Sequence, residues 1–294
     1  MDAGSSTETP MSEQRRAALS WSAEEIENAW KQVPKFKSNG FSVTGFPYPA
    51  SKPLAYVKFG HPIEWRQAEA RNQIFVHDAL QKLPPGAKQA CHAPEVYRTM
   101  KIGHLFFIIM EFVPGKTLAQ IMEDSESWES RREEVTDKIY RAIELLLSLP
   151  VPRDAKPGPV GGGHIRHPLF KDCEASIEYK SIDMLERHLN KVAAINNENP
   201  PIVTLERKLH FYFADFYEGN FIFTDSGDLY LIDFDQAGLL PLSFMAYALA
   251  DKWPVGFWIK DRLQLPESNI EAMRRASHWF LISFRKIGSC SVPL

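Results

Sequence analysis

The most informative stretch of the chain begins Leu209-His210-Phe211-Tyr212-Phe213-Ala214-Asp215-Phe216-Tyr217-Glu218-Gly219-Asn220-Phe221-Ile222-Phe223 and, after a polar turn, ends Leu231-Ile232-Asp233-Phe234-Asp235. Two apolar runs, 220–224 and 229–234, flank the turn sequence Asp225-Ser226-Gly227-Asp228. Apolar runs separated by such a turn are typical of a β-hairpin. The sequence therefore predicts a short antiparallel hairpin that is preceded by a polar loop.

Three polar side chains bracket this hairpin, namely Asp215, Asn220 and Asp233. If the turn is symmetric, Asn220 lies opposite Asp233 at the open end, and opposed side chains point to the same face about 5 Å apart. Carboxylate and amide oxygens in such an arrangement suit Mg²⁺, and Asp215 places a second carboxylate beside them. A turn of odd length with a bulge would shift the register by one residue. The alternative is that all three are turn and cap residues, which Asp and Asn favour.

Composition narrows the class of protein. The 294 residues are 44% hydrophobic, enough for a sizeable core, and 34 Lys and Arg against 37 Asp and Glu give a net charge of −3. This charge disfavours a nucleic-acid partner. No apolar run approaches the roughly 18 residues of a membrane span, and the start lacks the features of a signal peptide. Cys91, Cys173 and Cys290 form neither a disulfide framework nor a zinc spacing. We expect a soluble cytoplasmic protein in a reducing compartment, without membrane or nucleic-acid partners.

The chain is expected to have a disordered tail over residues 1–19, a small lobe over 20–113 and a larger lobe over 114–294, with Pro114-Gly115 at the junction. In the small lobe, alternating and apolar runs predict strands over 40–43, 54–59, 95–101 and 105–113, and helical spacing predicts a helix over 63–80.

The larger lobe is expected to be mainly helical. Val135, Ile139, Ala142 and Leu146 recur at helical intervals and describe one buried helix face. Further helices are expected over 177–194 and 243–287, the latter with breaks at Pro254 and near Leu265-Pro266. Residues 150–163 end in three glycines and predict a loop, but no Gly-Lys-Ser/Thr follows, which disfavours a phosphate-binding loop. His164 and His167 lack a third partner for a metal site.

The Asp-x-x-x-x-Asn spacing of Asp215 and Asn220, followed by a strand ending in Ile232-Asp233-Phe234, resembles the aminoglycoside phosphotransferase/choline kinase family. The resemblance extends over about residues 40–290, is strongest at this motif, and in the first lobe looks most like fungal members. It implies an α+β, two-lobed protein-kinase-like fold, with a small sheet-plus-helix lobe and a larger, mainly helical lobe. It also implies that Asp215 is the catalytic base toward a substrate hydroxyl, and that Asn220 and Asp233 hold the Mg²⁺ that bridges the ATP phosphates.

The same resemblance implies a phosphate-contacting lysine. Lys58, in Ala55-Tyr56-Val57-Lys58-Phe59, matches the family's strand lysine. Its partner should be a glutamate on the following helix, where Glu69 is expected to face inward and Glu64 is the competitor. A buried glutamate without a cation would be costly, which favours pairing of Glu69 with Lys58.

The run from Phe107 to Gly115 resembles the strand and hinge that carry the adenine in this family. Backbone groups of Glu111 and Val113 would meet the base edge and Met110 would line the pocket, in a cleft between the lobes. An ordinary buried strand that ends in a turn fits the same residues.

The sequence departs from the family pattern at three places. Phe213 replaces the usual His before the catalytic loop, which puts the loop geometry in doubt. The nearest candidate for a Gly-rich phosphate loop is the weak match over residues 39–45. Asp235 stands where protein kinases have Gly.

Three functions are therefore open. The favoured one is a Mg-ATP-dependent kinase that moves the γ-phosphate to a hydroxyl of a small molecule. The second is a catalytically impaired kinase-like binding protein, which the Phe213 departure would favour. The third is a Ser/Thr protein kinase, which is disfavoured because only 27 residues follow Leu265-Pro266-Glu267. The acidic residues around Asp172 could attract a cationic acceptor, but a solvated helix face is the preferred interpretation.

Overall fold

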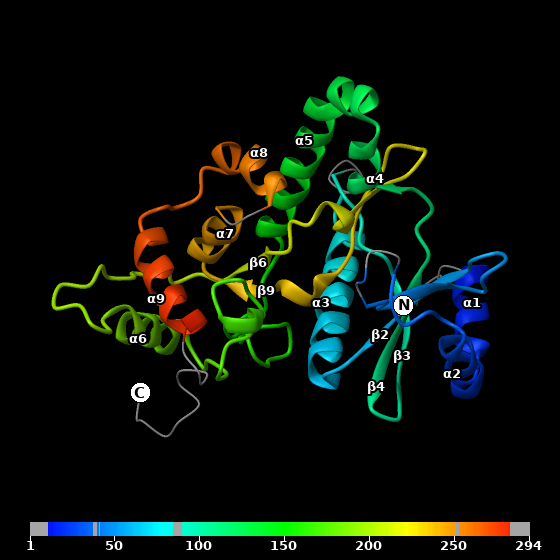
Figure 1. Cartoon of the computed structure of the whole chain (residues 1–294), viewed down its shortest axis with the longest axis horizontal. Helices are drawn as coiled ribbons and strands as arrows, with labels where there is room; N and C mark the ends of the chain where they lie inside the picture. Colours follow the sequence, from blue (N-terminus) through cyan, green and yellow to red (C-terminus); the bar gives the residue numbers. More distant parts are fainter. Residues whose placement is uncertain (1–10, 38–39, 41, 85–89, 251–252, 283–294) are drawn as a thin grey trace, which may run out of the picture. The chain divides into compact units, whose positions relative to one another are not determined.

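The computed structural model describes residues 11–37, 40, 42–84, 90–250 and 253–282. The chain divides into two compact units. The first comprises residues 1–66 and 95–112, and the second comprises residues 67–94 and 113–294. The described elements give an α+β fold, with an antiparallel sheet in the first unit and mainly helices in the second, which confirms the fold class expected from the sequence (Figure 1).

The first unit is built on a four-stranded antiparallel sheet with the order β1-β2-β4-β3. Its strands are β1 (Gly45–Tyr48), β2 (Ala55–Gly60), β3 (Val96–Ile102) and β4 (Leu105–Glu111). Six consecutive residues of β4, from Leu105 to Met110, are buried, because this strand is central and covered on both faces. The strand expected over 40–43 is instead β1, whose Pro47 is tolerated because β1 is an edge strand.

Two helices, α1 (Glu13–Ser20) and α2 (Ala23–Lys31), complete this unit. Helix α1 corrects the expectation of disorder through residue 19, while residues 1–10 lie outside the described residues. It forms because the Ser12 side chain caps its first turn, Ala18 is fully buried and Arg15 pairs with Glu95 of the same unit. These tertiary contacts override the polar composition of the segment.

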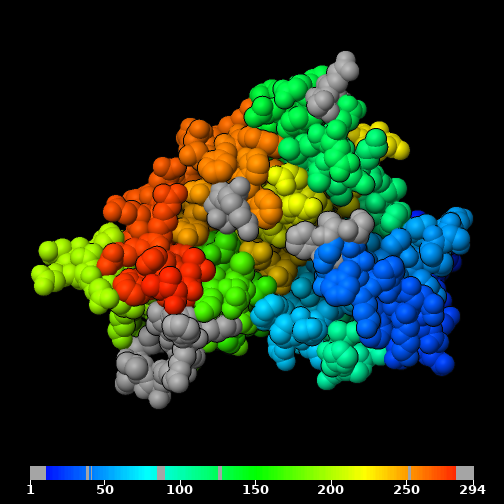
Figure 2. Space-filling model, in the orientation of Figure 1, coloured from blue at the N-terminus to red at the C-terminus, as the bar shows by residue number. Residues whose placement is uncertain are grey.

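The second unit is mainly helical, and the long helix α5 (Ser125–Ser148) runs through its core. The four residues expected to form one buried face of this helix are each no more than 1% exposed, which confirms the predicted helix. The other helices are α4 (Leu118–Glu123), α6 (Ile182–Ala193), α7 (Leu242–Leu249), α8 (Pro254–Leu263) and α9 (Ile270–Ile282). In the space-filling view, α8 in orange lies beside α9 in red on the surface of this unit (Figure 2).

Short strands and turns carry the polar residues of the second unit. One sheet has the order β5-β7-β8, from Lys116–Thr117, Phe221–Phe223 and Leu229–Leu231, and a second pairs β6 (His210–Phe213) with β9 (Ala237–Leu240). Short 3-10 helices occupy Lys171–Cys173 (η2), Glu218–Asn220 (η3) and Phe234–Gln236 (η4). Strands β5, β6 and β9 were not expected from the sequence.

The boundary between the units differs from the single junction expected at 113/114, because residues 67–94 belong to the second unit. Helix α3 (Ile63–Gln81) crosses the boundary, and its later turns are bonded to the second unit. Arg71 donates to the carbonyls of Val160 and Gly162, each at 2.8 Å, and the Phe75 ring stacks on Phe211. Such pairings join residues far apart in the sequence, so no local pattern could reveal them.

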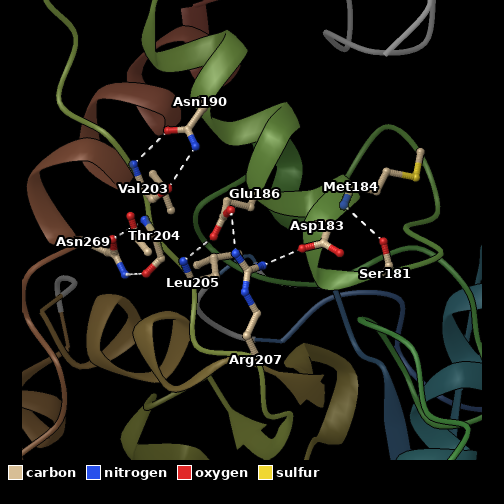
Figure 3. Close-up of polar contacts among 10 residues, drawn as sticks. All are labelled: Ser181, Asp183, Met184, Glu186, Asn190, Val203, Thr204, Leu205, Arg207 and Asn269. Atoms are coloured by element: carbon tan, nitrogen blue, oxygen red, sulfur yellow. Dashed lines mark hydrogen bonds and ion pairs between the residues drawn. The ribbon is translucent and has the colours of Figure 1, made fainter.

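The extended segment before β6 is held by side chains from helix α6 and from the turn that precedes α9 (Figure 3). Asn190 of α6 forms two hydrogen bonds with the backbone of Val203, and Asn269 forms two with that of Thr204. Glu186 accepts from the backbone N–H of Leu205. The side-chain amides thus replace a neighbouring strand, and the segment that leads into β6 has a fixed path.

None of the helices in the described part of the chain is long and apolar enough to cross a membrane.

Candidate active site

The register of the β7–β8 hairpin differs by one residue from the symmetric register expected from the sequence, which was therefore wrong. Phe221 pairs with Leu231, so Asn220 lies opposite Ile232 rather than Asp233, and the N–H of Ile232 donates to the carbonyl of Asn220 at 3.0 Å. The reason is a three-residue turn between Thr224 and Asp228, in which Gly227 adopts φ 85° and its N–H donates to the carbonyl of Thr224. Such a turn with a left-handed glycine adds a bulge and shifts the register by one residue.

The loop before the hairpin folds back on Asp215. The backbone N–H of Tyr217 donates to Oδ1 of Asp215 at 3.3 Å, and Nδ2 of Asn220 donates to the main-chain oxygen of Asp215 at 3.2 Å. The N–H of Asn220 donates to the carbonyl of Tyr217, which closes the turn. Asp215 and Asn220 are therefore brought together as the sequence spacing predicted.

Asp233 also comes close to Asp215, despite the shifted register. Burial raises the pKa of the Asp215 carboxyl to about 6, together with the negative charge of Asp233 and a smaller effect from Asp235. Hydrogen bonds from the Tyr217 backbone and the Asn220 side chain act in the opposite direction. A carboxylate whose charge raises the pKa of another carboxyl lies near that group. Asp233 reaches this position through a left-handed backbone conformation, φ 62° and ψ 71°, rather than through the strand pairing.

The donors present fit a hard cation such as Mg²⁺. Because the amide nitrogen of Asn220 is turned toward Asp215, its Oδ1 remains as the oxygen donor. In the described part of the chain, no group of three or more His, Cys, Asp and Glu side chains is arranged to hold a metal. Mg²⁺ is usually bound by one or two protein groups together with phosphates and water, a number that the two predicted ligands Asn220 and Asp233 would match.

Phe213 occupies the place of the family's histidine and is supported by rings. It is 1% exposed, and its ring lies edge-on to those of Phe216, Phe221 and Phe234, at centroid distances of 6.2, 6.1 and 5.5 Å. Edge-to-face pairs at these distances are favourable. Aromatic packing therefore fixes the base of the loop where the family usually has a polar side chain.

The turn after Asp233 is anchored at four successive residues. Nδ2 of Asn72 donates to the carbonyls of Phe234 (3.2 Å) and Ala237 (2.8 Å). The N–H of Ala214 donates to the carbonyl of Gln236 at 2.9 Å. Asp235 forms an ion pair with Arg166 at 2.8 Å. Neither Asn72 nor Arg166 was expected from the sequence to hold this turn. Asn72 lies three residues after Glu69 on α3, a spacing that places both on one helix face, and this was the available signal.

Asn72 also fixes the glycine-rich loop. Its Oδ1 accepts from the N–H of Val160, so this fully buried amide joins α3, the loop and the turn after Asp233. Gly161, Gly162 and Gly163 have φ values of 81°, 89° and 126°, and the loop's carbonyls face Arg71. This packing role agrees with the absence of a phosphate-loop motif.

His164 and His167 do not converge on a metal. Nδ1 of His164 is bonded to the carbonyl of Ala175. His167 is fully buried, with its two ring nitrogens bonded to Phe244 and Leu169, and burial lowers its pKa to about 3. Both side chains serve the packing of the second unit.

The residues predicted to bind the nucleotide are distributed over the two units. Lys58 of β2, Met110 and Glu111 of β4 belong to the first unit, and Glu69 of α3 and Val113 belong to the second. Lys58 is 7% exposed and Met110 is 4% exposed. The N–H of Glu111 donates to the carbonyl of Glu95 at 2.8 Å, within the sheet of the first unit.

Between the two candidate glutamates on α3, burial favours Glu69. Its side chain is fully buried, whereas Glu64 is exposed. The pairing of Glu69 with Lys58 stays a prediction. The weak glycine-rich candidate over 39–45 includes residues 39 and 41, which lie outside the described residues.

Comparison with known proteins places the chain in a family. The model of the phosphotransferase enzyme family matches residues 54–279, and the chain therefore belongs to that family. It is thus a phosphotransferase of the kinase-like type. Among solved structures it is similar to an aminoglycoside phosphotransferase from Alicyclobacillus acidocaldarius, at 14% identity and a TM-score of 0.36, over 94% of this chain and 85% of that one. No curated protein matches the chain.

Proposed function

We propose that the protein is a Mg-ATP-dependent kinase that moves the γ-phosphate of ATP to a hydroxyl of a small molecule. The observation that carries this proposal is the convergence of Asp215, Asn220 and Asp233 at one end of the β7–β8 hairpin, in a chain of the phosphotransferase family. Phosphoryl transfer depends mainly on positioning and on charge stabilisation, and these residues supply both.

In this proposal, Asp215 accepts the proton of the acceptor hydroxyl. A base works best when its pKa lies near the operating pH, and a pKa of about 6 leaves Asp215 mostly deprotonated at neutral pH. The Tyr217 backbone N–H fixes the orientation of the carboxylate. Asn220 and Asp233 hold Mg²⁺, which when bound neutralises charge on the phosphates. Lys58 contacts the phosphates and Glu69 pairs with Lys58, while Met110, Glu111 and Val113 surround the adenine.

A catalytically impaired binding protein is the second candidate, because Phe213 replaces the family's histidine. The packing of Phe213 against three rings supports an ordered catalytic loop and thereby favours the enzyme. The two candidates make different predictions for ATP consumption.

The first test measures nucleotide binding and turnover of the full chain. Melting temperatures are recorded with ATP and Mg²⁺ together and separately, and a ligand at 100 times its dissociation constant adds about 2.7 kcal/mol to the unfolding free energy. ATP consumption is then measured with a panel of small alcohols, amino sugars and choline-like compounds, and with a peptide panel. Absence of a thermal shift with millimolar Mg-ATP contradicts the proposal. Binding without consumption favours the binding protein, and consumption restricted to peptides favours a protein kinase.

The second test replaces the proposed base. Asp215→Asn should retain Mg-ATP binding but lower acceptor turnover by roughly 10²- to 10⁴-fold, the usual contribution of a general base. The control is Asp225→Asn, the same substitution at an exposed position in the turn of the same hairpin. Equal turnover of the parent and the Asp215→Asn chain would remove Asp215 from the catalytic role.

A further inference from the structure

Arg166 and Asp235 form a buried ion pair beside the proposed metal site. The Nη2 of Arg166 donates to Oδ2 of Asp235 at 2.8 Å, and Nε lies 3.4 Å from Oδ1, so the guanidinium meets the carboxylate at both oxygens. Their side chains are 7% and 12% exposed. Two-point contacts of this kind fix orientation as well as charge.

Arg166 is itself held at both ends. The hydroxyl of Tyr212, three residues before Asp215, donates to the main-chain oxygen of Arg166 at 2.9 Å, and Nη1 of Arg166 donates to the carbonyl of Asp172 at 3.0 Å. The backbone on either side of Arg166 is closed by hydrogen bonds between Ala175 and Ile165 and between His167 and Cys173. The guanidinium is therefore a fixed point relative to the strand that leads into Asp215.

Asp235 lies two residues after Asp233, whose left-handed backbone is unusual for a non-glycine residue. Such a conformation is unfavourable for a residue with a side chain and persists where the surroundings hold it in place. Asn72 holds the main chain at Phe234 and Ala237, and Ala214 holds it at Gln236. At Asp235 the anchor is the side chain, through Arg166.

We propose that Arg166 is a positioning residue, which through its ion pair with Asp235 holds the turn that presents the Asp233 carboxylate to the metal. This inference rests on the proposed function. It differs from two simpler roles, namely neutralising the charge of Asp235 and stabilising the fold, because it requires the two-point geometry itself. Residues that orient a ligand in this way typically contribute 10- to 100-fold to metal affinity.

The test is a double variant that leaves the net charge unchanged, Arg166→Met with Asp235→Asn. The matched control is Arg141→Met with Asp137→Asn, which removes an arginine–aspartate pair on α5 whose side chains are 65% and 41% exposed in the same unit. Mn²⁺ affinity is measured by electron paramagnetic resonance on the full chain, with a non-hydrolysable ATP analogue, and melting temperature is measured in EDTA. The Arg166 double variant should bind Mn²⁺ roughly 10- to 100-fold more weakly, while the control stays near the parent.

Parent-like Mn²⁺ affinity in the folded double variant overturns the inference, whatever happens to its melting temperature, because the ion pair then contributes stability alone. If the double variant does not fold, Arg166→Lys keeps the charge but loses the two-point contact, and parent-like Mn²⁺ affinity in that chain overturns the inference as well. A parent chain that binds neither the analogue nor Mn²⁺ refutes the proposed function, and the inference with it. The behaviour of the parent thus separates the two failures.

Discussion

Asp215 combines two properties that oppose each other. Its carboxyl is largely buried and lies close to Asp233, so the folded chain disfavours its charged form. The same carboxyl must be charged to act as a base. A site of this kind is expected to lower the stability of the metal-free protein, and a bound cation would relieve the repulsion.

This conflict predicts that the difference in unfolding free energy between the parent and Asp215→Asn depends on pH. The pKa of Asp215 is raised from 3.8 to about 6 on folding, so its contribution to stability is complete below about 3.8 and is lost as the pH rises through 6. In EDTA, the unfolding free energy of Asp215→Asn minus that of the parent should therefore increase from pH 4 to pH 7, by on the order of 1–3 kcal/mol.

Urea denaturation at several pH values measures this difference. Asp225→Asn, which alters an exposed carboxylate on the same hairpin, should show a nearly constant difference from the parent over the same range. A constant difference for Asp215→Asn too would mean that the carboxyl is not strained by burial and by Asp233.

The proposed metal ligands give a second prediction at this scale. Asp233→Ala should abolish the Mg²⁺ dependence of ATP binding and leave metal-free adenosine binding nearly intact, because it removes the charged ligand. Asn220→Ala should have a weaker effect of the same kind, because it removes a neutral one. Calorimetric titration with ATP, with and without Mg²⁺, measures both. Parent-like Mg-ATP binding in both variants would contradict the assignment of these two ligands.

At the scale of elements, side chains rather than a neighbouring strand bond the backbone of the segment between α6 and β6. Asn269 is 2% exposed and forms three hydrogen bonds, two with the backbone of Thr204 and one with the hydroxyl of Ser243. The Glu206 carboxylate accepts from the N–H and hydroxyl of Ser243. The path from α6 into β6, and hence to the catalytic loop, depends on these polar contacts (Figure 3).

Removing one of these amides should be costly. Asn269→Ala removes three hydrogen bonds, two with the backbone of Thr204 and one with the hydroxyl of Ser243, and each contributes about 0.5–1.5 kcal/mol. We expect the unfolding free energy, measured in urea, to fall by about 3 kcal/mol. Asn199→Ala, at an exposed position in the preceding loop, should change it by less than about 0.5 kcal/mol. Similar unfolding free energies for the two variants would show that the hydrogen bonds of Asn269 contribute little to stability.

For the whole molecule, the proposed function requires residues from both units. Lys58 is buried in β2 of the first unit, whereas the proposed base and the proposed metal ligands lie in the second. A buried lysine needs a compensating partner, and a phosphate or a glutamate would provide one. The family match spans parts of both units, since it covers residues 54–279.

Lys58→Met should therefore weaken Mg-ATP binding although the change lies outside the unit with the catalytic loop. A charge-assisted hydrogen bond contributes about 1.5–3 kcal/mol, which corresponds to roughly 10- to 100-fold in affinity. Calorimetric titration measures this effect, with Lys101→Met at an exposed position in the same sheet as the control. Equal weakening by both variants would indicate a general effect of charge rather than a phosphate contact.

The sequence by itself determined the features that depend on local spacing. The buried face of α5 follows from helical periodicity, and the capping box of Ser22 and Glu25 from their separation of three residues. The convergence of Asp215 and Asn220 follows from the five-residue spacing within one loop. In each case the contacts are made by residues close together in the chain, so a short pattern is sufficient.

The tertiary structure alone decided the features that depend on the path of the chain. Arg166 and Asp235 are 69 positions apart, and Asn72 and Phe234 are 162 positions apart, so no local pattern links them. The left-handed conformation of Gly227 shifts the hairpin register, and that of Asp233 restores its proximity to Asp215. The residue types of the site were therefore readable from the sequence, whereas the geometry that brings them together was set by long-range contacts.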